Sequence, residues 1–213
     1  LWELLGDPVA GLDWVGALLN ARGRVLPMAL EPLVIQGIVL REHGGAFERV
    51  QVRGQVNLAH EPQVHNIELV PAQARACPEA LASIEEADWV VLGPGSWRTS
   101  VLPHLLLREQ CEALSTTNAK RCVVMNLALD DKESNGLDAS AHLKLLQQYA
   151  PNLRLDVVIA DPSNMGVQSE FEDAARELGA KVLWASVRST TNPNVHDPLK
   201  LASAYNDMFA MRL

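Results

Sequence analysis

Hydrophobic and polar residues follow two different periods in the first seventy residues. Apolar residues recur at helical spacing, which predicts a helix over residues 2–22 with an interruption near Gly6-Asp7-Pro8. From residue 33 the period shortens, because residues 50–56 alternate apolar and polar positions and Gly44-Gly45 is a turn signal. We predict two or three antiparallel strands in residues 33–70, as a β-hairpin excursion from a main sheet.

The rest of the chain alternates short apolar runs with amphipathic stretches. We expect strands at residues 89–92, 121–127, 155–160 and 182–184, with helices between them. The fully apolar run Trp89-Val90-Val91-Leu92 is typical of a parallel strand that is buried on both faces. Strands that alternate with helices predict an α/β fold with a mainly parallel sheet.

Three helix starts are predicted from capping residues. Asp138 precedes one amphipathic stretch, and Asp197-Pro198 opens the last one. Ser169 and Glu172 have the spacing of a capping box, for a helix that ends at Gly179.

Composition narrows the class of protein. The 213 residues, 48% hydrophobic and 21% charged, suit a single α/β domain over residues 1–213. The sequence contains no run long enough for a membrane span and no signal peptide, and its three cysteines lack metal-like spacing, so we expect a cytoplasmic protein with reduced thiols. A net charge of −8 argues against a nucleic-acid partner.

The sequence opens in the middle of a pattern. Leu1 stands at the first position instead of Met, and residues 1–5 read as the end of a helix already under way. An α/β nucleotide-binding domain usually places its first phosphate loop near the N-terminus, so we expect the first βα units to precede this chain.

The segment after the predicted strand 89–92 is the strongest candidate for a binding site. It reads Gly93-Pro94-Gly95-Ser96-Trp97-Arg98-Thr99-Ser100. Its glycines allow close backbone approach to a ligand, and the hydroxyls of Ser96, Thr99 and Ser100 fall at a helix start, where N–H groups favour an anion. Arg98 either adds positive charge or points to solvent. We predict phosphate binding, and the alternative is an ordinary turn that needs glycine.

Polar residues also follow the predicted strand 121–127. We expect the amide of Asn126 to hydrogen-bond a ligand. Asp130, Asp131 and Glu133 either help to hold Mg²⁺ through waters or, as we favour, form a solvated acidic loop, so no metal ligand is assigned. No catalytic residue is assigned either, because GxSxG, HExxH, P-loop and GxGxxG motifs are absent and capping better accounts for Asp197 than a His196–Asp197 dyad does.

Residues 87–106 carry a family resemblance. Their sequence, ADWVVLGPGSWRTSVLPHLL, resembles the hallmark of the gluconeogenesis factor (YvcK-like) family, which is related to the 2-phospho-L-lactate transferases (CofD-like) of coenzyme F420 synthesis. Further matches lie at residues 24–28, 126–127, 136–143 and 196–202, so the resemblance spans nearly the whole chain and is strongest to actinobacterial members.

The resemblance implies a three-layer, Rossmann-like fold and a cytoplasmic protein needed for growth and cell shape on gluconeogenic carbon sources. It implies a nucleotide-sugar ligand such as UDP-N-acetylglucosamine, with no assigned reaction. The related transferases move a phospholactyl group onto a deazaflavin with Mg²⁺. Combined with the loop reasoning, we expect the ligand-binding residues to be Gly93, Pro94, Gly95, Ser96, Trp97, Thr99, Ser100 and Asn126.

The sequence departs from the family pattern in three places. The family's first glycine-rich loop lies before anything in this chain. The family's usual Pro-Gly-Glu-Thr after the asparagine is replaced by Asp131-Lys132-Glu133-Ser134. The arginine that many members carry before the His-Asp pair is Val195 here, so a sugar-nucleotide contact by that arginine does not carry over.

Three functional hypotheses follow. The first is a nucleotide-sugar-binding regulatory protein, and the second is an Mg²⁺-dependent enzyme of the phospholactate transferase kind, which needs mainly positioning and charge neutralisation. The third is an assembly protein, for instance a homodimer, in which Trp97 anchors an interface from an exposed loop.

Overall fold

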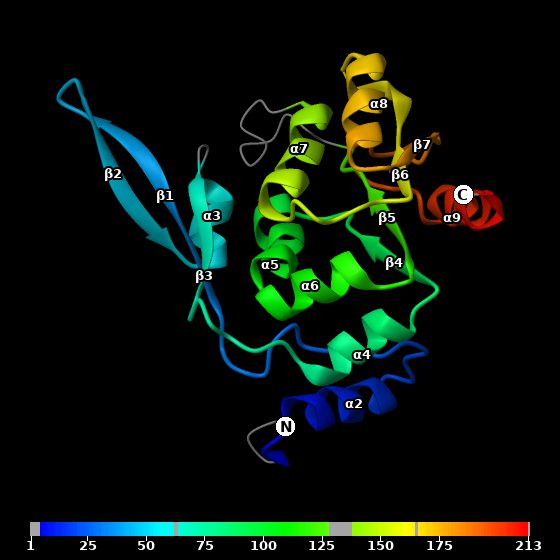
Figure 1. Ribbon diagram of the computed structural model, residues 1–213, viewed down its shortest axis with the longest axis horizontal. Coiled ribbons are helices and arrows are strands. Elements are labelled where there is room, and N and C mark those ends of the chain that lie inside the picture. The colour runs from blue at the N-terminus through cyan, green and yellow to red at the C-terminus, as the bar shows by residue number, and fades with distance from the viewer. Residues whose placement is uncertain (1–4, 62–63, 128–137, 165, 213) are drawn as a thin grey trace.

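The computed structural model describes residues 5–61, 64–127, 138–164 and 166–212. Its centre is a parallel sheet with the strand order β4-β5-β6-β7. The strands are β4 (Trp89–Leu92), β5 (Lys120–Val124), β6 (Val157–Ala160) and β7 (Lys181–Trp184), and each pairs in parallel with the next. The α/β prediction is therefore confirmed, and the carboxyl ends of the four strands meet at one edge of the sheet (Figure 1).

Helices cover both faces of this sheet, which makes three layers (Figure 1). Between successive strands come α5 (Leu102–Leu106) with α6 (Arg108–Thr116), then α7 (Ala139–Tyr149), then α8 (Gln168–Glu177). These helices share a hydrophobic core with Val123 and Val158 of the sheet. The alternate residues Val124 and Val157 face the other way and pack with the final helix, α9 (Pro198–Ala210).

The strand β4 is only partly covered. It is the edge strand of the described sheet, and Val91 is 39% exposed. Its apolar run correctly predicted a strand, but the prediction that both faces are buried is wrong for the described residues. Before β4 come α2 (Pro8–Leu18) and α4 (Pro78–Glu86), which lie side by side below the sheet in Figure 1.

The excursion is a three-stranded antiparallel sheet in the order β2-β1-β3, which projects from the main body (Figure 1). It consists of β1 (Val34–His43), β2 (Ala46–Arg53) and β3 (His65–Val70), with the short helix α3 (Gln55–His60) between the last two. The predicted strand over residues 50–56 is too long, because Gly54 has a φ of 96° and ends the strand. Val56 then belongs to α3, where the completely buried Leu58 packs into the core.

Two of the three predicted helix starts are confirmed. The carboxylate of Asp138 accepts a hydrogen bond from the Ala141 amide at 2.7 Å, and Asp197 likewise caps α9. The capping box is wrong: Ser169 lies inside α8, and Glu172 instead accepts a hydrogen bond from the indole of Trp184 on β7, at 2.9 Å. Among the described helices, none is both long and apolar enough to cross a membrane.

Candidate functional site

The loop after β4 turns sharply at Gly93. This residue has a φ of +77°, and a Cβ at its position would lie 2.9 Å from the carbonyl oxygen of Val124. Both facts restrict the position to glycine. The peptide bond between Gly93 and Pro94 is cis. The loop therefore passes close to the end of β5.

The hydroxyl groups of the loop mainly hold its own turn together. The loop leads into a single wide turn of π-helix, Trp97–Val101. Ser96 caps this turn, because its Oγ accepts hydrogen bonds from the amide of Thr99 at 3.0 Å and from the Thr99 hydroxyl at 2.6 Å. Ser100 is exposed and, together with Gly93, lines a small separate pocket of about 190 Å³.

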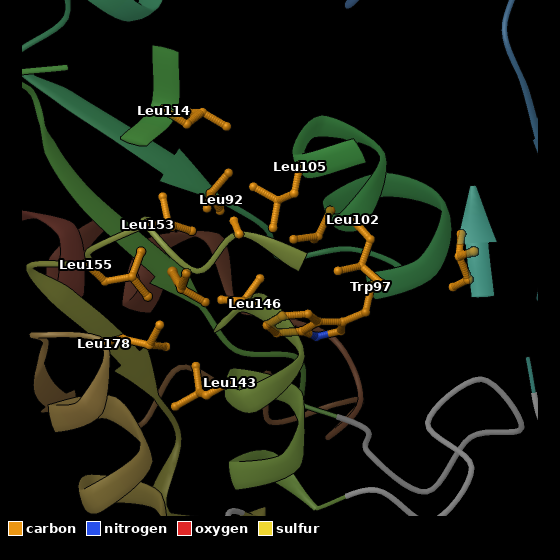
Figure 2. Close-up of a cluster of buried hydrophobic side chains, with 14 of the residues drawn as sticks. Leu92, Trp97, Leu102, Leu105, Leu114, Leu143, Leu146, Leu153, Leu155 and Leu178 are labelled. Atoms are coloured by element: carbon orange, nitrogen blue, oxygen red, sulfur yellow. The ribbon is translucent and has the colours of Figure 1, made fainter. Parts of the chain in front are cut away.

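Trp97 and Arg98 point into the protein. Trp97 is only 4% exposed, and its ring lies 5.2 Å from that of His142. Figure 2 shows the indole among Leu102, Leu143 and Leu146. The hypothesis that Trp97 anchors an interface from an exposed loop is therefore wrong, because the side chain belongs to the core.

Arg98 does not point to solvent. Its side chain is buried, and Nη1 donates a hydrogen bond to the carbonyl oxygen of Glu61 at 2.6 Å. The Glu61 carboxylate in turn pairs with Arg41 of β1, also at 2.6 Å. Arg98 therefore links the loop to the antiparallel excursion.

Asn126 lies just beyond the end of β5 and clamps the loop. Its Nδ2 donates to the carbonyl oxygen of Gly95 at 2.9 Å, while its Oδ1 accepts a hydrogen bond from the Gly95 amide at 3.1 Å. One side-chain amide thus satisfies both polar groups of a single backbone residue. The structure brings Asn126 to the loop, as expected, and gives it a positioning contact there.

An open pocket of about 450 Å³ lies where the loop, the end of β5 and a later segment meet. It is lined by residues 94–95, 126–127 and 194–196. Of the predicted binding residues, Pro94, Gly95 and Asn126 contribute to these walls. The side chains along the walls are aliphatic, amide or imidazole groups.

His196 contributes its imidazole to the third wall. Burial lowers the pKa of His196, while the backbone of Met125 and the charge of Asp161 act in the opposite direction. The neighbouring Asp197 caps α9 through hydrogen bonds from the amides of Leu199 and Lys200 at 3.0 and 3.2 Å. This arrangement agrees with the interpretation of Asp197 as a capping residue.

Sequence reasoning missed two charged residues at the same edge of the sheet. Asp161 follows β6 directly and is only 2% exposed, and Arg188 lies 3.3 Å from its carboxylate. A signal for Asp161 did exist, since it stands at the end of a buried strand. Arg188 follows β7 at some distance in a polar loop, and nothing in the sequence distinguishes it.

The acidic residues considered as Mg²⁺ ligands, Asp130, Asp131 and Glu133, lie outside the described part of the chain. In the described part of the chain, no group of three His, Cys, Asp or Glu side chains could hold a metal ion. The Mg²⁺ hypothesis therefore stays a prediction.

The fold and the pocket define an α/β protein with a candidate ligand site beyond the carboxyl ends of its parallel strands. The chain belongs to the family described as 2-phospho-L-lactate transferase CofD, whose family model matches residues 1–188. The predicted resemblance is thereby confirmed.

The chain is also similar to proteins named after gluconeogenesis. It is 38% identical over 214 residues to a "Putative gluconeogenesis factor" of Mycobacterium tuberculosis, a match that covers 99% of this chain and 62% of that protein. The corresponding protein of Mycobacterium leprae is 39% identical over 208 residues, which is 96% of this chain and 58% of that protein. The chain therefore spans about three fifths of the length of these relatives.

A solved structure supports the fold. The crystal structure of a member of the UPF0052 family from Bacillus halodurans matches with a TM-score of 0.78 and 24% identity, over 95% of this chain and 68% of that one. The likeness extends across both the parallel sheet and the excursion, since nearly the whole chain is covered.

Proposed function

We propose that this chain binds a nucleotide sugar, such as UDP-N-acetylglucosamine, and regulates cell morphogenesis during growth on gluconeogenic carbon sources. The observation that carries the proposal is the pocket over Gly95, because it lies where doubly wound α/β proteins bind their ligands. The names of the mycobacterial relatives support the link to gluconeogenesis.

The uncharged side chains of the walls suit an uncharged sugar. The two hydrogen bonds from Asn126 to Gly95 fix the backbone conformation of residues 94–95 before a ligand binds. The side-chain amide of Asn194 can hydrogen-bond a sugar hydroxyl. A pocket of about 450 Å³ is within the usual range for small-molecule sites.

Calorimetric titration with UDP-N-acetylglucosamine tests this proposal. Val195 lines the pocket and is 51% exposed, so Val195→Asp should fold normally and place a negative charge against the diphosphate. We expect it to weaken binding at least about ten-fold. Val25→Asp is the matched control, since Val25 is 66% exposed and lies away from the pocket, and it should bind as the wild type does. Absence of heat with any UDP-sugar in the wild type, titrated as this chain and with its natural flanking sequence, rules the proposal out.

The family match favours a second candidate, an Mg²⁺-dependent transferase of the phospholactate kind. Here the pocket would hold the phosphorylated donor, and the protein would contribute positioning. Incubation with a phospholactyl donor, a deazaflavin and Mg²⁺ distinguishes the two functions. A coupled product detected by mass spectrometry supports the transferase, whereas tight UDP-sugar binding without product supports the regulatory protein.

A further inference from the structure

Arg188 belongs to a short loop that forms one wall of the pocket. The two arms of this loop are joined by backbone hydrogen bonds, from Ser189 N–H to the Val195 carbonyl oxygen at 2.9 Å and from Asp197 N–H to the Val187 carbonyl oxygen at 2.8 Å. Residues 194–196 of the loop line the pocket. The position of the whole loop therefore decides where this wall stands.

The guanidinium group of Arg188 spans from this wall to the wall formed by residues 126–127. Its Nη1 donates to the carbonyl oxygen of Pro193 at 3.2 Å, immediately before the lining residues 194–196. Its Nη2 donates to the carbonyl oxygen of Leu127, which lines the other wall, at 3.0 Å. One planar group thus holds both walls at a fixed separation, which a single point charge could not do.

The third contact of Arg188 anchors it to the sheet. Its Nε lies 3.3 Å from Oδ1 of Asp161, the buried residue at the end of β6. Asp161 is itself fixed, because its carboxylate accepts hydrogen bonds from the amides of Ser163 and Val187, both at 3.0 Å. The contact with Asp161 therefore fixes the guanidinium group of Arg188 relative to the parallel sheet. The two hydrogen bonds to Leu127 and Pro193 then restrict the movement of the pocket walls.

We propose that Arg188 is a positioning residue that sets the width of the pocket and hence its affinity for the diphosphate-sugar ligand. This inference rests on the proposed function for the identity of the ligand. Arg188 acts through the carbonyl groups of Leu127 and Pro193 and does not itself contact the ligand.

A second arginine–aspartate pair, Arg121 with Asp156, serves as a control for the effect of losing such a pair anywhere in the fold. Arg121 lies 3.9 Å from Asp156 at the amino ends of the central strands, and its side chain is 16% exposed, against 20% for Arg188. Arg121 also donates to two backbone carbonyl oxygens, at 3.2 Å each. It therefore resembles Arg188 in burial and in its two backbone contacts, although its Nε has no hydrogen-bond partner among the described residues, and it lies at the opposite edge of the sheet from the pocket.

Two measurements on Arg188→Gln and Arg121→Gln test the proposal. In hydrogen–deuterium exchange of the ligand-free protein, we expect the amides of Ser189 and Asp197 to exchange about ten-fold faster in Arg188→Gln and to change less than about two-fold in Arg121→Gln. In calorimetric titration with UDP-N-acetylglucosamine, we expect Kd to rise at least about ten-fold in Arg188→Gln only.

Arg188→Lys separates geometry from charge. Lysine keeps the positive charge but lacks the planar fork, so its Kd should lie closer to that of Arg188→Gln than to the wild type. Wild-type affinity in Arg188→Lys, or unchanged exchange of the two amides in Arg188→Gln, overturns the positioning role. So does faster exchange with an unchanged Kd. If the wild type binds no UDP-sugar, the proposed function fails, and the exchange measurement alone still decides whether Arg188 holds the loop.

Discussion

The contact between Asn126 and Gly95 makes a prediction that can be worked out from the structure. Asn126→Asp preserves the shape of the side chain and keeps the oxygen that accepts from the Gly95 amide. In the wild type, Nδ2 of Asn126 donates to the Gly95 carbonyl oxygen at 2.9 Å, and in the variant a second oxygen replaces this nitrogen. A hydrogen bond thus becomes a contact between a carboxylate oxygen and a carbonyl oxygen.

The cost of this change has a lower and an upper bound. Loss of the hydrogen bond alone removes about 1 kcal/mol of stability. The protein can relieve the repulsion by protonating the introduced carboxyl, which restores a donor. Protonation of a group with an ordinary pKa near 3.9 costs about 4 kcal/mol at pH 7. We therefore expect Asn126→Asp to lower the free energy of unfolding by about 1–4 kcal/mol at this pH.

The same reasoning fixes the pH dependence. The contact with the Gly95 carbonyl raises the folded-state pKa of the introduced carboxyl above its unfolded value, so the folded protein binds more protons. Its stability relative to the wild type must then fall as pH rises, and the deficit should be smaller at pH 5 than at pH 7.

Urea unfolding followed by tryptophan fluorescence at both pH values measures this deficit. Asn118→Asp is the control, since Asn118 is exposed and gains the same charge away from the loop. A deficit below about 0.5 kcal/mol at pH 7, or one no larger than that of the control, refutes the clamp. A large deficit that does not change with pH refutes the carboxylate–carbonyl contact and leaves the lost hydrogen bond to the Gly95 carbonyl oxygen as its cause.

Three further predictions concern the fold around the site. In urea unfolding, Gly93→Ala should lower the free energy of unfolding more than Gly44→Ala does. Both glycines have a positive φ, but only at Gly93 would the added Cβ meet a carbonyl oxygen, at 2.9 Å. Equal losses in the two variants would contradict this close approach of the Val124 carbonyl oxygen to Gly93. Asp197→Ala should lower the free energy of unfolding by about 1 kcal/mol through loss of the α9 cap, and a loss within error of zero would contradict it. Burial alone would raise the pKa of Asp161, but hydrogen bonds and the neighbouring arginine outweigh burial and lower that pKa. The stability that the Asp161 carboxylate contributes is therefore present above the unfolded pKa near 3.9 and is lost as pH falls through the folded value. Asp161→Asn should therefore flatten the acid side of the stability–pH curve, and an unchanged curve would show that this carboxylate contributes nothing there.

The sequence correctly predicted those strands and helix caps that depend on residues close together in the chain. The strand at 89–92 and the caps at Asp138 and Asp197 depend on neighbouring residues, and all three are present. The capping-box prediction was wrong because α8 begins at Gln168, which puts Ser169 inside the helix, and the Glu172 carboxylate instead accepts a hydrogen bond from the indole of Trp184 on β7. Sequence spacing alone carries no information about that contact.

The candidate site shows the same limit. The loop and Asn126 were predicted to bind a ligand beyond the carboxyl ends of the strands; the structure brings them into contact, and the ligand binding stays a prediction. The directions of Trp97 and Arg98 were not predictable, since each is set by a partner far along the chain, His142 and Glu61 respectively. Side-chain direction in a loop follows from tertiary contacts more than from residue type.

These contacts bear on how binding measurements at this site are to be read. Three polar residues beyond the strand ends already satisfy other groups: Asn126 serves the Gly95 backbone, Asp161 serves Arg188, and Arg188 serves two carbonyl groups. A buried polar group without a hydrogen-bond partner costs about 1–3 kcal/mol of stability, so these contacts stabilise the ligand-free protein. A substitution at these positions will therefore change stability and affinity together. Only a comparison with a variant elsewhere whose measured stability loss is the same can separate an effect on the pocket from a general loosening of the fold, and Arg121→Gln is the first variant to measure.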